Sequence, residues 1–190
     1  MPSILKSTKN TRPIINDSMR YIRSDAIINL EDEEIQWLIE NNILTVVDLR
    51  MEEETEKNPC CLKHHNEFTY LNIPVSYGDE MPLTSEMMSP YFLKMVDNTM
   101  IKIILTIENS KTNAIYFCRQ GKDRSGVVSA LLLLRQGFSH DEIISDYLLS
   151  ADNLVESIEQ DCRDYPGLKK EAATPNSEYM MQFLQKVARS

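Results

Sequence analysis

Two apolar stretches separated by a short polar loop constrain the fold of this chain more than any other feature. Residues 113–118 read NAIYFC, a run typical of a buried strand. Residues 125–137 read SGVVSALLLLRQG, which predicts a buried helix that ends at Gly137. A buried strand that leads through a few residues into a buried helix is a basic unit of α/β folds. We therefore expect a sheet covered by helices.

Other segments continue this alternation of strands and helices. Continuous apolar runs predict strands at 44–49 (LTVVDL) and 68–75 (FTYLNIPV). Apolar residues at helical spacing predict helices over the following ranges: 29–42, 89–108 with Ser89 and Pro90 at its start, 141–149 (DEIISDYLL) with a capping box of Ser139 and Glu142, about 151–164, and 175–188. Tyr179, Met180, Met181 and Phe183 are expected to form the docking face of the last helix. The first 20 residues are polar and read as irregular, and residues 51–66 read as a charged loop.

These elements predict an α/β fold with a central sheet of four to five strands, mostly parallel or mixed, flanked by helices. The 190 residues, 42% of them hydrophobic, suit one domain over 1–190 whose part from 139 to 190 is helical.

Charge and cysteine usage narrow the classes of function. A net charge of −9 argues against nucleic acid or an anionic membrane surface as a partner, because both require a broad basic face. We find no run long enough to insert stably in a membrane and no secretory leader. The four cysteines (Cys60, Cys61, Cys118 and Cys162) do not form a disulfide pattern. We expect a cytoplasmic protein with reduced thiols, and a secreted effector stays an alternative.

The polar loop between the two apolar stretches reads C-R-Q-G-K-D-R-S-G over residues 118–126. A loop that enters a helix N-terminus turns several backbone N–H groups toward one point, and the helix dipole adds positive potential there. The same field lowers the pKa of a thiol such as Cys118 from about 8.5 toward 3.5–7.5. Arg124 offers a planar fork for two oxygens of a tetrahedral anion. We expect Cys118 to be a nucleophile and Arg124 to hold a bound phosphate.

The remaining loop residues fit the same interpretation. Gly121 suits a positive φ or a close approach to a ligand, and Gly126 suits a helix that crowds a strand. The hydroxyl of Ser125 is expected to stabilise the thiolate and to help it leave in a second step. The simpler interpretation is a buried thiol followed by a solvated turn. The agreement of strand, glycines, hydroxyl and helix supports the catalytic one.

The loop sequence resembles the phosphate-binding loop of the cysteine-dependent protein tyrosine phosphatase superfamily. Its GKDR variant is similar to bacterial tyrosine/serine phosphatases of the mycobacterial type B kind, which are dual-specificity-like. Four other stretches match that family's pattern: YIRSDA (21–26), TVVDLR (45–50), YLNIPV (70–75) and DYLLSADNL (146–154). One position departs from it, since Phe117 stands where the family usually has a histidine that orders the loop and tunes the thiol.

The resemblance implies a phosphotyrosine phosphatase-like fold and a phosphatase that forms a phosphocysteine without metal or cofactor. It implies a general acid, for which Asp79 on an upstream loop and Asp123 inside the loop are both candidates. It also implies that the loop residues Arg119, Gln120, Gly121, Lys122 and Gly126 bind the substrate phosphate. A lysine at 122 is associated in relatives with phosphoinositide or inositol phosphate substrates.

Several alternatives stay open at this point. The substrate is a phosphotyrosine protein, a phosphoinositide or a soluble inositol phosphate. A catalytically weak module that binds phosphorylated partners is the main rival function, because Phe117 replaces the histidine. A thiol redox enzyme would require a resolving cysteine, and the context of Cys162 does not support one. Asp48 and Arg50 are expected to form a structural ion pair behind the loop, and we expect no metal at Cys61 and His65.

Overall fold

The computed structural model describes residues 1–76 and 82–188, and its centre is a mixed five-stranded sheet. The strands are β1 (Arg12–Ile15), β2 (Ser18–Ser24), β3 (Ile43–Asp48), β4 (Thr69–Asn72) and β5 (Asn113–Phe117), in the spatial order β1-β2-β5-β3-β4. β1 runs antiparallel to β2, and the other neighbouring pairs are parallel. The expected α/β fold with a mixed central sheet is thus confirmed, and β5 lies at its centre.

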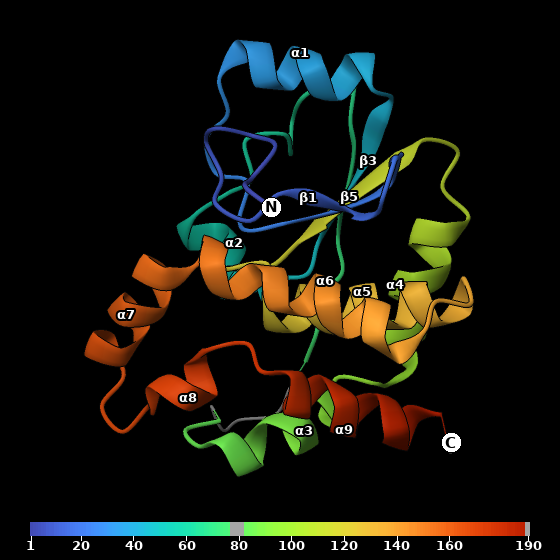
Figure 1. The fold of residues 1–190 in the computed structure, drawn as a ribbon. Helices are drawn as coiled ribbons and strands as arrows, with labels where there is room; N and C mark the ends of the chain where they lie inside the picture. The colour runs from blue at the N-terminus through green and yellow to red at the C-terminus, as the bar shows by residue number, and fades with distance from the viewer. Residues whose placement is uncertain (77–81, 189–190) are drawn as a thin grey trace.

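Helices cover both faces of the sheet (Figure 1). They are α1 (Asp32–Glu40), α2 (Glu52–Lys57), α3 (Ser85–Lys94), α4 (Asn98–Glu108), α5 (Asp123–Arg135), α6 (His140–Asn153), α7 (Val155–Asp164), α8 (Lys170–Ala173) and α9 (Ser177–Val187). α1 lies over one face, and α4, α5 and α6 lie over the other. α3, α8 and α9 form a further layer beyond α5 and α6, and α9 packs against α3 and α6. In the described part of the chain, no helix combines the length and the apolar character needed to cross a membrane.

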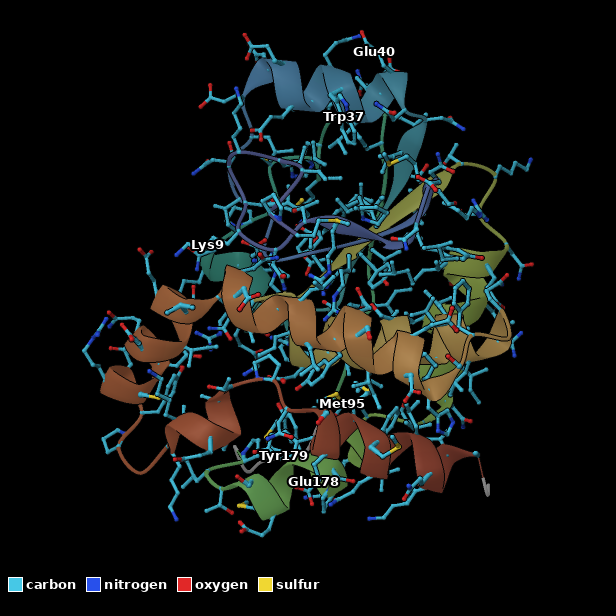
Figure 2. The ribbon with its side chains drawn as sticks, in the orientation of Figure 1. Lys9, Trp37, Glu40, Met95, Glu178 and Tyr179 are labelled. Carbon is cyan, nitrogen blue, oxygen red and sulfur yellow. The ribbon has the colours of Figure 1, made fainter. Side chains whose placement is uncertain are left out.

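The side chains of β5 point alternately to the two faces of the sheet, and they contribute to a separate apolar cluster on each face. Ile115 and Phe117 belong to the cluster under α1, whereas Ala114, Tyr116 and Cys118 belong to the larger cluster on the α5 side. Successive side chains of a strand point to opposite faces, so the thiol at the strand end lies on the α5 side. On the α1 side, Trp37 lies beneath its helix toward the sheet, and Glu40 points away from it (Figure 2).

Several helix predictions are confirmed. Gly137, with φ of +84°, follows α5 directly after its C-cap residue, Gln136. The backbone N–H of Ser139 donates to Oε2 of Glu142 at 2.8 Å, which completes the expected capping box of α6. The apolar face of α9 is buried as expected, through Tyr179, Met180 and Phe183, with Met181 packed against the same cluster.

The N-terminal segment differs from the expectation of an irregular chain over the first 20 residues, because β1 and β2 lie there. Their sequences, RPII and SMRYIRS, mix apolar residues with arginines. Arginines are usually exposed, so such a mixture is typical of a segment in contact with solvent. Both Arg12 and Arg23 are in fact fully buried. Their partners, described below, come from parts of the chain far away in sequence.

Other predicted elements needed correction. Residues 51–66 contain α2 rather than only a loop. The single helix expected over 89–108 is two helices, of which α3 begins at Ser85. The second, α4, starts anew because the carboxylate of Asp97 caps it by accepting the N–H of Met100 at 2.9 Å. Pro90 therefore lies inside α3 instead of at its start. The helix expected from about 151 is α7, which begins only at Val155, and α8 follows it without a sequence signal that we recognised.

Candidate active site

Strand β5 places Cys118 at the centre of the sheet edge where its parallel strands end. Phe117 is in register with Ser24 of β2 and Asp48 of β3, so the following residue emerges between two other strand ends. The side chain of Cys118 is buried and lines a cavity of about 430 Å³. Loop and helix residues on the same cavity include Arg119, Gln120, Lys122, Asp123 and Arg124. The structure thus brings these five residues together with Cys118 around one cavity, whereas the other expected loop residues (Gly121, Ser125 and Gly126) do not line it.

The carbonyl groups of the 118–124 loop are bound from behind by the N-terminal part of the chain. The side-chain amide of Asn10 donates to the carbonyl of Gly121 at 2.9 Å and to that of Gln120 at 3.2 Å. The backbone N–H of Ala26 donates to the carbonyl of Arg119 at 3.2 Å. In a trans peptide the N–H points opposite to the C=O. Because these carbonyls face the scaffold, the following N–H groups point toward the cavity.

Arg23 of β2 completes this support from within the core. Its Nη2 donates to the carbonyl of Gly121 at 2.8 Å and to that of Lys122 at 3.0 Å. Its Nη1 forms an ion pair with Oδ2 of Asp146 on α6 at 2.5 Å. One buried guanidinium therefore joins β2, the 118–124 loop and α6. This fixes the curvature of the loop without any contact from solvent.

The same carboxylate also binds Arg12 of β1, through Nε at 3.1 Å. Two buried guanidiniums thus share the single carboxylate of Asp146, and the cluster retains one net positive charge when all three groups are ionised. Burial, followed by repulsion from Arg23, lowers the pKa of Arg12 to about 10. At neutral pH the cluster still places positive charge beneath the loop, where it favours an anion above.

Both expected special glycines have a steric reason. Gly121 has φ of +65°, and a Cβ there would lie 2.4 Å from the carbonyl oxygen of Ser24. At Gly126 a Cβ would lie 3.2 Å from the ring of Tyr147 and 3.3 Å from Nη2 of Arg23. The predictions of a positive φ at Gly121 and of close packing at Gly126 are confirmed.

The electrostatics of the site favour the ionised form of Cys118. Burial alone opposes ionisation, but the charge of Arg124 and hydrogen bonding from the side chain and N–H of Ser125 outweigh it and lower the pKa of the thiol. Oγ of Ser125 is itself buried and has no oxygen or nitrogen partner among the described residues. Burial instead raises the pKa of Cys60 to about 12 and also raises that of Cys61. The thiol in the loop therefore differs from these two in kind.

Arg124 is oriented by Glu54, a residue that the sequence did not single out. Nη1 of Arg124 donates to Oε2 of Glu54 at 2.6 Å, and Nη2 donates to Oε1 at 2.8 Å. This bidentate pair uses the end of the guanidinium, so Glu54 does not occupy the edge that carries Nε. Burial acts against the carboxylate, but Arg124 outweighs it and lowers the pKa of Glu54. The short helix α2 thus serves as the support that aims Arg124.

The other two cations of the loop also have carboxylate or carbonyl partners. Nζ of Lys122 donates to the carbonyl of Ala173, the last residue of α8, at 2.5 Å and lies 3.4 Å from Oδ2 of Asp123. Arg119 forms a bidentate pair with Asp161 of α7. Helices α2, α7 and α8, which supply these partners, lie toward the same side of the molecule, at the left of Figure 1.

Of the two candidate general acids, one lies within the described part of the chain. Asp123 is the first residue of α5 and lines the cavity with Cys118. Its Oδ2 faces Lys122, while its Oδ1 is buried without a hydrogen-bond partner among the described residues. Asp79 lies outside the described residues, which stop at 76 and resume at 82.

A model of the tyrosine phosphatase family matches residues 8–190. The chain belongs to this family. The match confirms the resemblance seen in the sequence. A tyrosine-protein phosphatase of Nostoc commune is 26% identical over 144 residues, which make up 70% of this chain and 49% of that protein. The chain therefore spans about half the length of this curated relative.

Solved structures of phosphatases are similar in fold at low sequence identity. A mouse protein described as a candidate dual specificity phosphatase, solved with zinc tungstate, has a TM-score of 0.50 at 12% identity, over 97% of this chain and 91% of that one. The core catalytic domain of the PP-IP phosphatase SIW14 from S. cerevisiae, solved with citrate, has a TM-score of 0.48 at 15% identity, over 100% and 93%. The first likeness supports the shared α/β fold.

Phe117, the departure from the family pattern, is fully buried in the cluster on the α1 side. The guanidinium of Arg50 lies over its ring, with Cζ 5.2 Å from the ring centroid. Arg50 in turn pairs with Asp48, with Nη2 to Oδ2 at 2.7 Å, and both side chains are almost fully buried. The expected ion pair is confirmed. Through Arg50, this ion pair packs on the ring of Phe117 and so holds the residue before Cys118. The ring offers no hydrogen bond, which a histidine at this position could form.

The structure adds positions that the sequence did not single out. Asn10, Arg23, Glu54 and Asp161 each hold a part of the 118–124 loop or Arg124. Arg23 lies within a stretch that resembles the family, which was the available signal. Among residues 1–76 and 82–188, no three His, Cys, Asp or Glu side chains are grouped to hold a metal ion.

Proposed function

We propose that this protein hydrolyses phosphate monoesters through a phosphocysteine formed on Cys118. The observation that carries this proposal is a buried thiol of lowered pKa at the base of a loop whose carbonyls at residues 119–122 accept hydrogen bonds from the scaffold. Such a loop presents N–H groups to the three equatorial oxygens of a phosphoryl group, and Arg124 adds charge beside them. A thiolate and an anion cradle at the same point suit in-line attack on phosphorus.

In the first step the thiolate of Cys118 attacks phosphorus while the ester P–O bond breaks. The leaving oxygen takes a proton from an aspartic acid, which becomes a carboxylate. In the second step that carboxylate accepts a proton from water, the water oxygen attacks phosphorus, and the P–S bond breaks. Inorganic phosphate and the thiolate are regenerated. The hydroxyl of Ser125, which has no oxygen or nitrogen partner among the described residues, stabilises the thiolate as it leaves.

Asp123 is the general acid that the described geometry supports. It shares the cavity with Cys118, and the absence of a partner for its buried Oδ1 leaves one oxygen available for a proton. Its other oxygen, Oδ2, is already engaged, because it lies 3.4 Å from the ammonium of Lys122. Asp79 stays a second candidate for this role, and the two make different predictions for their asparagine variants.

The walls of the cavity favour a substrate with one phosphate on an aromatic body, such as phosphotyrosine. Apolar side chains of Met88, Leu168 and Ala172 line the cavity above the loop, together with the rings of Tyr91 and Tyr165. These side chains suit a flat apolar group rather than the polyhydroxylated ring of an inositol phosphate. Phosphoinositides and soluble inositol phosphates are the other candidate substrates, and Lys122 would be their contact.

We also propose one domain over 1–190, because both apolar clusters are built on β5.

Release of phosphate tests the proposed function. Para-nitrophenyl phosphate, a phosphotyrosine peptide, a phosphoinositide and inositol polyphosphates would be compared in parallel, with Cys118→Ser as the control. We expect turnover of the aryl phosphates that the control lacks. If the wild type binds phosphotyrosine peptide but releases no more phosphate than the control, the protein is a phosphate-binding module instead.

A further inference from the structure

A single carboxylate from α7 holds two side chains of the 118–124 loop. Asp161 accepts Nη1 of Arg119 on Oδ1 at 2.9 Å and Nη2 on Oδ2 at 2.8 Å. The side-chain amide of Gln120 donates to Oδ2 of the same residue at 2.9 Å. The side chain of Asp161 is 7% exposed, whereas that of Arg119 is 47% exposed. The carboxylate is therefore a built part of the site rather than a surface charge.

These three side chains, Arg119, Gln120 and Asp161, form a wall between two hollows. On one side lies the cavity of about 430 Å³ that holds Cys118. On the other side lies a more open hollow of about 600 Å³, lined mainly by residues of α7. All three side chains line both hollows. A substrate that extends from a bound phosphate in this direction must therefore pass Asp161.

The charge of the wall depends on Asp161. With the carboxylate present, the positive charge of Arg119 is neutralised by a bidentate pair, which is the strongest geometry for these groups. A second phosphate on the substrate would have to displace Asp161 from Arg119 and then lie beside that carboxylate. Like charges within a few ångströms repel, and partial burial weakens the screening of that repulsion. Without the carboxylate, Arg119 and Gln120 would together offer donors to a second anion.

We propose that Asp161 is a specificity-determining residue that excludes substrates with a second phosphate next to the one that reacts. This inference rests on the proposed phosphatase function for its biological meaning. It concerns binding alone, however, and is tested without turnover. It also accounts for Arg119 without requiring a polyphosphorylated ligand, since the charge of Arg119 is neutralised by a carboxylate of the same chain.

The test measures the affinity of two ligands by calorimetry in a Cys118→Ser background. Inorganic phosphate measures binding to the 118–124 loop alone. Inositol hexakisphosphate measures binding of one phosphate to that loop together with the contacts of its neighbouring phosphates. We expect Asp161→Asn to lower the Kd of inositol hexakisphosphate about tenfold and that of inorganic phosphate by less than about threefold, because only the former reaches Arg119. Adding Arg119→Met to Asp161→Asn should abolish this increase in affinity for inositol hexakisphosphate.

Asp164→Asn is the matched control. Asp164 is on the same helix and lines only the outer hollow, where it accepts the amide of Gln160 at 2.7 Å, so its removal changes the net charge by the same amount. Three results would each overturn the proposal. Asp161→Asn could raise the affinity for both ligands equally, Asp164→Asn could raise the affinity for inositol hexakisphosphate as much as Asp161→Asn does, or the increase could persist when Arg119→Met is added.

A second variant covers the case in which Asp161→Asn does not fold, as judged by its thermal melting curve. Arg119→Met alone leaves the carboxylate of Asp161 without its cation. We expect it to weaken binding of inositol hexakisphosphate about tenfold more than binding of inorganic phosphate. Equal weakening of both ligands would refute the inference. Failure of the wild type to release phosphate would count against the proposed function but would leave this ratio of affinities unaffected.

Discussion

Arg23 and Gly121 are joined by two hydrogen bonds, in which Nη2 and Nε of the arginine donate to one carbonyl oxygen at 2.8 and 3.2 Å. The arginine is fully buried, and the carboxylate that pairs with it, Asp146, also pairs with Arg12. Burial of this charge has a large desolvation cost unless every partner is present. The shape of the 118–124 loop therefore depends on a strand nearly 100 residues away in sequence.

Arg23→Lys tests this dependence. The substitution keeps a positive charge but loses the fork that reaches Gly121, Lys122 and Asp146 together. We expect kcat/KM for para-nitrophenyl phosphate to fall about 10²-fold, because a small displacement of the loop misaligns the N–H groups. Arg20→Lys is the control, since Arg20 lies on the same strand but donates to carbonyls within residues 107–112. An equal loss in both variants would mean that the effect is general destabilisation.

Gly121→Ala tests the tight turn. An added Cβ would lie 2.4 Å from backbone at Ser24, and φ of +65° is itself unfavourable for alanine. We expect the free energy of unfolding to fall by more than about 2 kcal/mol and most activity to be lost. Gly137→Ala has a similarly positive φ but nothing within 4 Å, so it should cost only about 1 kcal/mol and leave activity intact. Urea denaturation and phosphate release measure both, and a similar cost at the two sites would contradict the steric argument.

Glu54→Gln tests the support of Arg124. The variant loses the charge of the bidentate pair, and we expect kcat/KM to fall about tenfold or more, since Arg124 is then less firmly aimed. Glu53→Gln, on the exposed side of the same helix, should change little. If both substitutions reduced activity alike, Glu54 would have no special role.

The same pair predicts a pH dependence of stability. The folded protein lowers the pKa of Glu54, so the pair stabilises the fold fully above the ordinary carboxyl pKa of about 4.5 and ceases to do so as pH falls through the lower folded value. Urea unfolding from about pH 6 down to about pH 3 should show a steeper loss of stability in the wild type than in Glu54→Gln. Parallel curves would show that the Arg124–Glu54 pair contributes nothing to stability.

Asparagine variants at Asp123 and Asp79 distinguish the two candidate acids. Loss of the true acid should slow hydrolysis of a substrate with a poor leaving group by about 10²–10³-fold and affect an activated aryl phosphate far less. We expect this pattern for Asp123→Asn, because Asp123 shares the cavity with Cys118. Rate constants for phenyl phosphate and para-nitrophenyl phosphate provide the comparison. The same pattern in Asp79→Asn, with Asp123→Asn unaffected, would reassign the acid.

The strand, loop and helix around Cys118 were predictable because local rules agree there. An apolar β run, a glycine that needs positive φ and an apolar helix each have a signal in neighbouring residues. β1 and β2 were missed for the opposite reason. Their arginines are buried only because Asp146, on α6, reaches them, and periodicity within a short window carries no information on such a partner.

The supports of the site were harder to predict than its reacting groups. Glu54 lies in EEETEK, where four glutamates look equivalent until the fold brings one of them to Arg124. Asp161 is similarly one of several acidic residues along α7. Sequence indicated that Arg119 and Lys122 are cations near a phosphate. Only the structure shows that both are bound by other parts of the chain.

The most direct test of the account is to trap the covalent intermediate. Wild-type protein would be mixed with para-nitrophenyl phosphate, quenched in acid within milliseconds, digested and analysed by mass spectrometry. We expect one phosphoryl group on the peptide that contains Cys118 and none in Cys118→Ser. A phosphoryl group on another residue, or phosphate release by Cys118→Ser at the wild-type rate, would contradict the proposed mechanism.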